Sequence, residues 1–226
     1  MYTVQTIAQV VQGHFQQQAH NATITHLVYD SRRIQFAEGA LFFALTTSSS
    51  DGHQYISQAY KNGVRHFVVA HNIDMNAVPG SNVIVVQNTL QALQDLAAYH
   101  RQHFKIPFIG ITGSNGKTVV KEWLYQLLQS DYHIVRSPKS FNSQIGVPLS
   151  VWQVAQQHTL GIFEAGISRP GEMAKLEKII QPLIGVLTNI GEAHDEGFLS
   201  TQQKLEEKLK LFFSCSVNGG SHLKER

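Results

Sequence analysis

The stretch PFIGITGSNGKTVVKEWLYQLLQS, residues 107–130, decides the fold expected for this chain. It begins with a short apolar run typical of a buried strand, passes through a glycine-rich turn, and continues with the apolar spacing of an amphipathic helix. A glycine-rich turn between a strand and a helix is the context that a phosphate-binding loop requires. The stretch therefore predicts an α/β fold with an anion site where the strand meets the helix.

The remainder of residues 106–213 repeats this alternation of strand and helix. Such a rhythm predicts a parallel sheet with helices on both faces, and ligands of such sheets bind outside the carboxyl ends of the strands. We expect strands at 107–112, 133–137, 159–166 and 183–190, and helices at 117–130, 145–157, 171–181 and 200–213.

Residues 1–88 have the pattern of a smaller α/β domain, which a linker helix at 89–105 joins to the domain formed by residues 106–226. The helix pattern itself covers residues 89–104, and Thr89 is a possible N-cap. In the smaller domain we expect helices at 3–11 and 55–63, and strands at 24–31, 39–45, 64–70 and 82–87.

The composition excludes several classes of protein. Of the 226 residues, 42% are hydrophobic and 15% are charged, which is enough apolar material for a packed core. The formal charge of +2 offers no dense basic field, so nucleic acid is not favoured as a partner. No apolar run approaches the roughly 20 residues that span a bilayer. We expect no signal peptide, because residues 1–14 have no basic segment followed by an apolar one. The single cysteine, Cys215, excludes an internal disulfide. A cytoplasmic protein is the default expectation.

The glycine-rich turn has the residue types that phosphate binding needs. Gly113 and Gly116 let the backbone curl closely around a phosphate. Lys117 would neutralise β- and γ-phosphates, and the Thr118 hydroxyl would ligate Mg²⁺. The upstream glycine, Gly110, lies one residue earlier than in the strict G-x-x-x-x-G-K-[ST] pattern. The alternative is a Gly/Asn/Ser turn that only caps the helix.

Two further residues follow strands of the same predicted sheet. Glu164 ends the strand TLGIFEAG, and His194 follows the strand LIGVLTNI. Because the carboxyl ends of parallel strands share one edge, a carboxylate and an imidazole there could hold Mg²⁺ near the phosphates. Each also has an ordinary alternative, a capping or solvent-facing carboxylate for Glu164 and an exposed loop position for His194.

The turn TGSNGKT, residues 112–118, resembles the ATP loop of the Mur ligases, which are ATP-dependent amide ligases of peptidoglycan synthesis. Members of that family depart from the strict phosphate-loop pattern in the same way. The resemblance covers residues 24 to about 213. Its other motifs are YDSRRI (29–34), GALFFAL (39–45), DGHQYI (51–56), KTVVKE (117–122), FNSQIGVPLS (141–150), FEAGISRPGEM (163–173) and TNIGEAHDEGF (188–198).

Within the family, the motifs are most similar to the branch that adds D-alanyl-D-alanine to UDP-N-acetylmuramoyl-tripeptide. The resemblance therefore implies these two substrates, with ATP and Mg²⁺ as cofactors, and a cytoplasmic enzyme. The pattern also resembles the form of this ligase that precedes an alanine racemase. Alternatives are the ligase that adds the third peptide residue, a folylpolyglutamate synthase, and a nucleotide-binding module without activity.

The resemblance implies a role for each matching residue of the second domain. Lys117 and Thr118 would serve the ATP phosphates and the first Mg²⁺, and Glu164 would also ligate Mg²⁺. His194 would ligate the second, together with Lys208 as a carbamate. Lys208 can also be an exposed lysine of a charged helix, with Lys204 and Lys210 as alternative alignments. The implied ATP-binding residues are Gly113, Ser114, Asn115, Gly116, Lys117 and Thr118, and the implied catalytic residues are Lys117, His194 and Lys208.

Substrate-binding residues are implied in both domains. Ser31 and Arg32 would contact the UDP end of the nucleotide-sugar peptide, and Asp51 belongs to a second turn of the same domain. Asn142 and Ser143 would contact substrate or an ATP phosphate. The alternatives are local turns for the first three residues and a helix cap for the last two.

The family has a third domain that closes over ATP and binds the incoming amine. We expect that domain to be absent from these 226 residues, and we expect the chain alone not to complete the ligation. The sequence gives no expectation for the oligomeric state.

Overall fold

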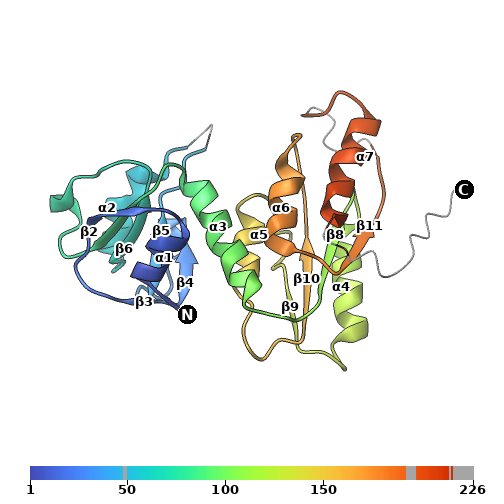
Figure 1. Ribbon diagram of the computed structural model, residues 1–226, viewed down its shortest axis with the longest axis horizontal. Coiled ribbons are helices and arrows are strands. Elements are labelled where there is room, and N and C mark those ends of the chain that lie inside the picture. The colour runs from blue at the N-terminus through green and yellow to red at the C-terminus, as the bar shows by residue number, and fades with distance from the viewer. Residues whose placement is uncertain (48–49, 192–196, 214, 216–226) are drawn as a thin grey trace, which may run out of the picture. The chain divides into compact units, whose positions relative to one another are not determined.

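The computed structural model describes residues 1–47, 50–191, 197–213 and 215. The chain forms two compact units, Met1–Tyr99 and His100–Arg226, drawn in Figure 1. Helix α3 (Thr89–Gln102) runs through the boundary between them. The mixed α/β fold expected from the sequence is confirmed.

The second unit is built on a four-stranded parallel sheet with the order β11-β8-β10-β9. Every residue of β8 and β10 is buried, which suits their central positions. The bounds of the strands are β8 (Phe108–Thr112), β9 (Ile134–Arg136), β10 (Leu160–Glu164) and β11 (Ile184–Leu187).

Helical segments cover both faces of this sheet. Ile109 and Ile111 pack with the apolar side of α4 (Lys117–Leu128). Gly110, between them, faces the opposite side, where a Cβ would meet Leu211 at 3.3 Å. Leu211 belongs to the short helix η5 (Lys210–Phe212). The other helices of this unit are α5 (Gly146–Val151), α6 (Glu172–Ile180) and α7 (Thr201–Leu209).

The strand order places a switch point at the end of β8. After β8 the chain builds β9 and then β10 on one side of it, and β11 then pairs with the other side of β8. The carboxyl end of β8 therefore lies between those of β10 and β11. In open parallel sheets, ligands bind in the crevice at such a point.

The first unit contains a five-stranded sheet of order β2-β7-β6-β5-β4, in which β4 to β7 are parallel and β2 is antiparallel. Phe42 and Phe67 are fully buried on neighbouring strands and pack edge to face. The strands are β2 (His14–Gln17), β4 (His26–Val28), β5 (Ala40–Phe43), β6 (His66–Val69) and β7 (Asn82–Val85). Strands β1 (Tyr2–Thr3) and β3 (Thr23–Ile24) form a separate antiparallel pair. The helices are α1 (Val4–Val10) and α2 (Ile56–Lys61), with short turns η1 (Ser31–Arg33), η2 (Gly52–Tyr55) and η3 (Met75–Ala77).

Three details differ from the sequence predictions. Strands β1, β2 and β3 were not expected. Helix α5 ends at Val151, although a helix was expected over 145–157. Thr89 does not cap α3, because its hydroxyl donates to the Ala44 carbonyl at 3.0 Å. Asn88 caps the helix instead, and its Oδ1 accepts from the Gln91 N–H at 2.9 Å. Within the described residues, no helix combines the length and apolar character that crossing a membrane requires.

Candidate functional site

The glycine-rich turn follows β8 directly and ends at the start of α4. Gly113 and Gly116 have φ angles of 143° and 79°, a region that residues with a Cβ rarely adopt. A Cβ at Gly113 would also lie 1.9 Å from Thr188 Oγ1, so this position has no room for a side chain. The turn therefore depends on glycine both for its conformation and for its close approach to the segment after β11.

That segment after β11 braces the turn. Asn189 accepts the Ser114 N–H through its carbonyl at 2.9 Å and the Asn115 N–H through Oδ1 at 2.8 Å. Thr188 Oγ1 donates to the Asn115 carbonyl at 2.6 Å. The Ser114 hydroxyl lies 3.0 Å from both the carbonyl and the N–H of Gly191. The turn is thus held in shape by hydrogen bonds that cross from one strand end to the next.

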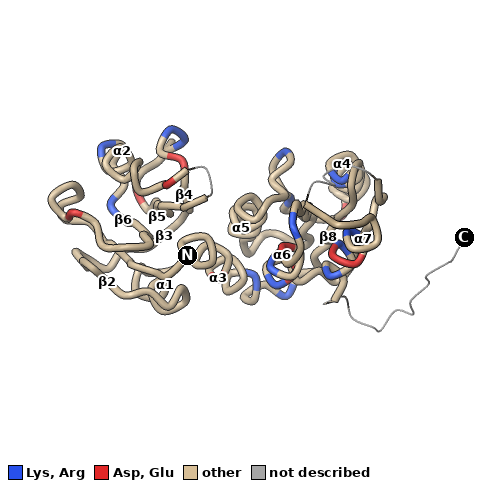
Figure 2. Tube along the Cα trace, turned by 90° about the horizontal axis from the view of Figure 1, so that it is seen from above, with Lys and Arg blue, Asp and Glu red and all other residues tan. Residues whose placement is uncertain are grey.

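Three lysine side chains from two helices contact either this turn or the segment after β11 that braces it. Lys117, on α4, donates to the Gly113 and Ser114 carbonyls at 2.9 and 3.2 Å. Lys208, on α7, donates to the Gly113 carbonyl at 3.1 Å, and Lys204 donates to the Gly191 carbonyl. Figure 2 shows basic positions on both α4 and α7. Because the ammonium groups of Lys117 and Lys208 contact neutral carbonyls, the turn has positive charge beside it that suits a polyphosphate.

Burial and mutual repulsion change the acidity of these lysines. Lys204 and Lys208 are 1% and 3% exposed. Burial lowers the pKa of Lys208 to about 8, and the positive charges of Lys117 and Lys204 add to this shift. Burial also lowers the pKa of Lys117, against the opposing effect of the Glu164 carboxylate. Lys208 is therefore partly neutral near pH 8, which is the form in which an amine reacts with carbon dioxide.

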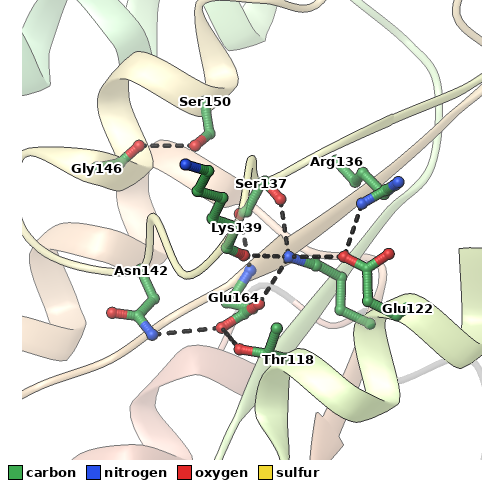
Figure 3. Close-up of polar contacts among 10 residues, drawn as sticks. Thr118, Glu122, Arg136, Ser137, Lys139, Asn142, Gly146, Ser150 and Glu164 are labelled. Carbon is green, nitrogen blue, oxygen red and sulfur yellow. Dashed lines mark hydrogen bonds and ion pairs between the residues drawn. The ribbon is translucent and has the colours of Figure 1, made fainter.

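A buried carboxylate lies at the end of β10, next to the same turn. Glu164 Oε2 accepts from Thr118 Oγ1 at 3.1 Å and from Asn142 Nδ2 at 3.3 Å (Figure 3). Its Oε1 forms an ion pair with Lys121 Nζ at 2.9 Å. Within the described residues, no three His, Cys, Asp or Glu side chains gather into a metal site. Carboxylate and hydroxyl oxygens nevertheless suit Mg²⁺, which usually takes one or two protein ligands together with phosphates and water.

The other predicted residues of the second unit have separate environments. Ser143 Oγ accepts from the Gly146 N–H at 3.1 Å, so its side chain supports the start of α5. Asn142, by contrast, points to Glu164. His194 lies outside the described residues.

In the first unit, the turns after β4 and β5 lie at the carboxyl end of the parallel strands. Asp30 accepts the N–H of Arg32 and pairs with its guanidinium at 2.9 Å, and both groups belong to the turn that contains Ser31. This pairing lowers the pKa of Asp30. Ser31 is buried, and its carbonyl accepts from Asn62 Nδ2 at 2.8 Å.

The second turn of this unit is tied to the sheet through a histidine. His53 Nε2 accepts from the Ala70 N–H at 2.9 Å, and His53 Nδ1 lies 2.5 Å from Asp51 Oδ1. Asp51 Oδ1 also accepts the His53 N–H at 3.0 Å, and this bond lowers the pKa of Asp51. A Cβ at Gly52 would lie 2.6 Å from the Leu45 nitrogen, so the turn packs tightly against β5. These contacts favour the interpretation of Asp51 as a turn residue.

Sequence reasoning missed two contributors to the second site and one residue that caps a helix of the same unit. Lys121 is one helical turn after Lys117 on the buried face of α4, and that spacing was the available signal. Asn189 stands in the motif TNIGEAHDEGF, but its contacts depend on the sheet order. Glu207 accepts the Gly171 and Met173 N–H groups at the start of α6, which no local pattern indicates.

Comparison with known proteins places these features in context. Residues 23–101 match the model of the Mur ligase family, catalytic domain, and residues 111–223 match the Mur ligase middle domain. The UDP-N-acetylmuramoyl-tripeptide–D-alanyl-D-alanine ligase of Rickettsia prowazekii (strain Madrid E) is 38% identical over 181 residues, which cover 80% of this chain and 40% of that protein.

Solved structures give the same result. MurF from Acinetobacter baumannii matches with a TM-score of 0.86 and 29% identity, covering 96% of this chain and 47% of that chain. The MurF ligase from Thermotoga maritima in complex with ADP matches with a TM-score of 0.74 and 29% identity, covering 86% and 44%. The chain thus spans less than half the length of these relatives.

Proposed function

This chain belongs to the Mur ligase family, and from that premise we propose that residues 112–118 bind the phosphates of ATP in an amide-forming ligase. The observation that carries the proposal is the position of Lys117, whose ammonium group contacts two carbonyls of the glycine-rich turn beside the buried carboxylate of Glu164. A braced backbone with cationic side chains suits a polyphosphate. The relative from Thermotoga maritima was solved with ADP, which supports an adenine nucleotide as the ligand.

The substrates follow from the relatives. We propose that the whole protein adds D-alanyl-D-alanine to UDP-N-acetylmuramoyl-tripeptide, a step of peptidoglycan synthesis in the cytoplasm. The terminal carboxylate of the tripeptide attacks the γ-phosphorus, ADP leaves, and an acyl phosphate forms. The amine of D-alanyl-D-alanine then attacks the acyl carbon and inorganic phosphate leaves.

Ligation would need more than this chain. Because the chain covers 40% of the Rickettsia prowazekii ligase, we propose that residues outside it help to bind and orient the amine. Mass spectrometry of a mixture of the chain, both substrates and Mg-ATP should detect no ligated product. Robust product would contradict this part of the proposal.

Lys117 and Thr118 of the turn have different proposed roles. When nucleotide binds, the Lys117 ammonium group would donate to phosphate oxygens instead of the Gly113 and Ser114 carbonyls. The turn would orient the nucleotide. Thr118 Oγ1 and Glu164 Oε2, which are 3.1 Å apart, would hold Mg²⁺. The bound cation would neutralise charge on the phosphates. Asn142 would keep Glu164 in place, since its amide donates to Oε2.

Lys208 is proposed as a carbamate that provides an oxygen ligand for a second Mg²⁺. Its support is the buried position on α7 and the pKa lowered to about 8 by that burial. His194 is proposed as the other ligand on the sequence resemblance alone. Lys204 and Lys210 are weaker choices, because Lys204 is directed to Gly191 and Lys210 pairs with Glu207 at 2.6 Å.

The first domain, residues 1–88, is proposed to bind the UDP end of the substrate, with 89–105 as the linker helix and 106–226 as the ATP-binding domain. Its support is the position of Ser31 and Arg32 at the carboxyl end of parallel strands. Asp51 and Ser143 keep their substrate roles as weaker proposals, since both side chains are occupied by turn and helix contacts.

Calorimetry with Mg-ATP tests the central proposal. Lys117→Ala should reduce ATP affinity by at least about tenfold, because the ammonium next to the phosphates is lost. Lys175→Ala, at an exposed position of α6, is the matched control and should bind as the parent does. Equal affinity of Lys117→Ala and the parent would contradict the assignment of this turn.

A further inference from the structure

The proposed function gives Lys121 no role, although this residue lies one helical turn after Lys117 and pairs with Glu164. Its side chain and that of Glu164 are both fully buried, with Nζ 2.9 Å from Glu164 Oε1. Nζ also donates to the Ser137 carbonyl at 2.8 Å and to the Lys139 carbonyl. A fully buried lysine is rare and needs compensation, so this arrangement calls for a specific role.

The segment after β9 is shaped around this ion pair. Ser137 offers its carbonyl to Lys121 and its Oγ to the Glu164 N–H, at 3.1 Å. Lys139 has a φ of 50°, which is uncommon for a residue with a Cβ, and its carbonyl accepts from Lys121. Residues 137–139 therefore hold both members of the pair and fix their relative position.

The two carboxylate oxygens of Glu164 have different surroundings. No donor in the described part of the chain gives Oε1 a hydrogen bond, so its contact with Lys121 is an ion pair. Oε2 accepts from Thr118 and Asn142, as Figure 3 shows. With Oε1 held by charge, the carboxylate plane is set and Oε2 stays beside the phosphate-binding turn.

We propose that Lys121 is a positioning residue that orients the Glu164 carboxylate toward a divalent cation bound beside the phosphate-binding turn. This inference rests on the proposed function, which supplies the cation and the nucleotide. Lys121 acts through Glu164 and through no contact of its own with nucleotide or metal.

A purely electrostatic role makes the opposite prediction. An ammonium group 2.9 Å from a metal ligand repels a divalent cation, so if Lys121 acted only by repelling the cation, its removal would tighten cation binding. If Lys121 holds the carboxylate in place, its removal lets Glu164 turn and weakens cation binding. The sign of the change therefore separates the two roles.

The test uses Mn²⁺ as a spectroscopic substitute for Mg²⁺. Electron paramagnetic resonance measures Mn²⁺ bound to the ADP-saturated chain, and calorimetry in EDTA measures metal-free ADP binding. In Lys121→Met we expect Mn²⁺ affinity to fall roughly 10- to 100-fold, as when partners that orient metal ligands are lost. Metal-free ADP affinity should stay within about twofold, because Lys117 and its turn are intact. The matched control, Lys175→Met, should change neither value.

Each result decides the matter. Unchanged or tighter Mn²⁺ binding in Lys121→Met would overturn the proposal, and so would an equal loss of metal-free ADP binding. If that variant does not fold, Lys121→Gln replaces it, because its amide can still donate to the Ser137 carbonyl, and the same loss is expected. Failure of both to fold would assign Lys121 to the fold and overturn its positioning role. A parent chain that binds no ADP would instead show that the proposed function fails, before any variant is compared.

Discussion

The residues that follow the parallel strands make different kinds of contact in the two units. In the first unit, charged side chains pair with near neighbours: Arg32 with Asp30, and His53 with Asp51, each two residues apart. In the second unit, the contacts join distant segments. Lys208 reaches Gly113 across 95 positions, and Thr118 reaches Glu164 across 46.

This difference separates turn chemistry from site chemistry. A carboxylate that pairs within its own turn stabilises that turn whether or not a ligand is present. Three lysines that face carbonyl oxygens repel one another, and such an arrangement is characteristic of a site that binds an anion. The second unit therefore indicates its ligand more strongly than the first.

We expect the largest effect from a substitution that disrupts the glycine-rich turn of the second unit. In Gly113→Ala, the new Cβ would lie 1.9 Å from Thr188 Oγ1, and the φ angle at this position is strained for alanine. In Gly171→Ala, the φ of 84° is also strained, but the new Cβ would have no neighbour within 4 Å. We expect Gly113→Ala to lower the free energy of unfolding by roughly 4 kcal/mol and to abolish ADP binding, and Gly171→Ala to cost about 1 kcal/mol. Both tryptophans, Trp123 and Trp152, lie in this unit, so urea titrations followed by tryptophan fluorescence measure the change. Equal losses in the two variants would show that the contact with Thr188 is unimportant.

A somewhat smaller effect is expected in how the free energy of unfolding of each unit depends on pH. The pKa of Lys208 is about 8 in the folded chain against an ordinary value of 10.5, so the unfolded chain binds more protons between these values. Stability should therefore rise with pH in this window, by about 3 kcal/mol in total, and the rise should be missing in Lys208→Met.

Urea titrations from pH 7.5 to 10 in bicarbonate-free buffer measure this difference. His66→Gln is the control from the first unit, because burial lowers the pKa of His66 to about 4 and its window lies below pH 6.5. The gap between His66→Gln and the parent should stay constant above pH 7.5. A parent and a Lys208→Met variant with parallel profiles would refute the lowered pKa.

The smallest expected effect concerns the first unit. Arg32 is highly exposed and pairs within its own turn, so Arg32→Ala should leave the unfolding midpoint unchanged. If this turn binds the UDP group, the variant should still weaken binding of UDP-N-acetylmuramoyl-tripeptide severalfold. Amide NMR titrations measure this, with Arg33→Ala as the neighbouring control. Shifts confined to residues 106–213 would remove the nucleotide-sugar site from the first unit.

The phosphate-binding turn and the parallel sheet were predictable because their signals are local. Gly113, Gly116 and Lys117 stand together between an apolar run and an amphipathic helix, and each strand of the second unit reads as a separate apolar segment. The turns around Asp30 and Asp51 were predictable as turns for the same reason.

Features that depend on distant contacts were not predictable. The role of Lys121 depends on Glu164 and on two carbonyls after β9. Helix α5 stops early where other contacts begin. The Val154 carbonyl accepts from His100, which lies 54 positions away, and the Ala155 N–H donates to the His158 ring within a local turn. Strand β2 was missed because its sequence, HFQQ, lacks the β-branched residues that mark a strand.

The hydrogen bonds from Asn189 to the turn have a consequence for ionic strength. The Ser114 and Asn115 N–H groups already donate to Asn189. If they donate to a phosphate instead, one hydrogen bond replaces another, so these two groups add little net affinity. Attraction by the ammonium groups then provides a larger share of the binding free energy. Added salt should weaken this nucleotide site more steeply than one built mainly on backbone amides.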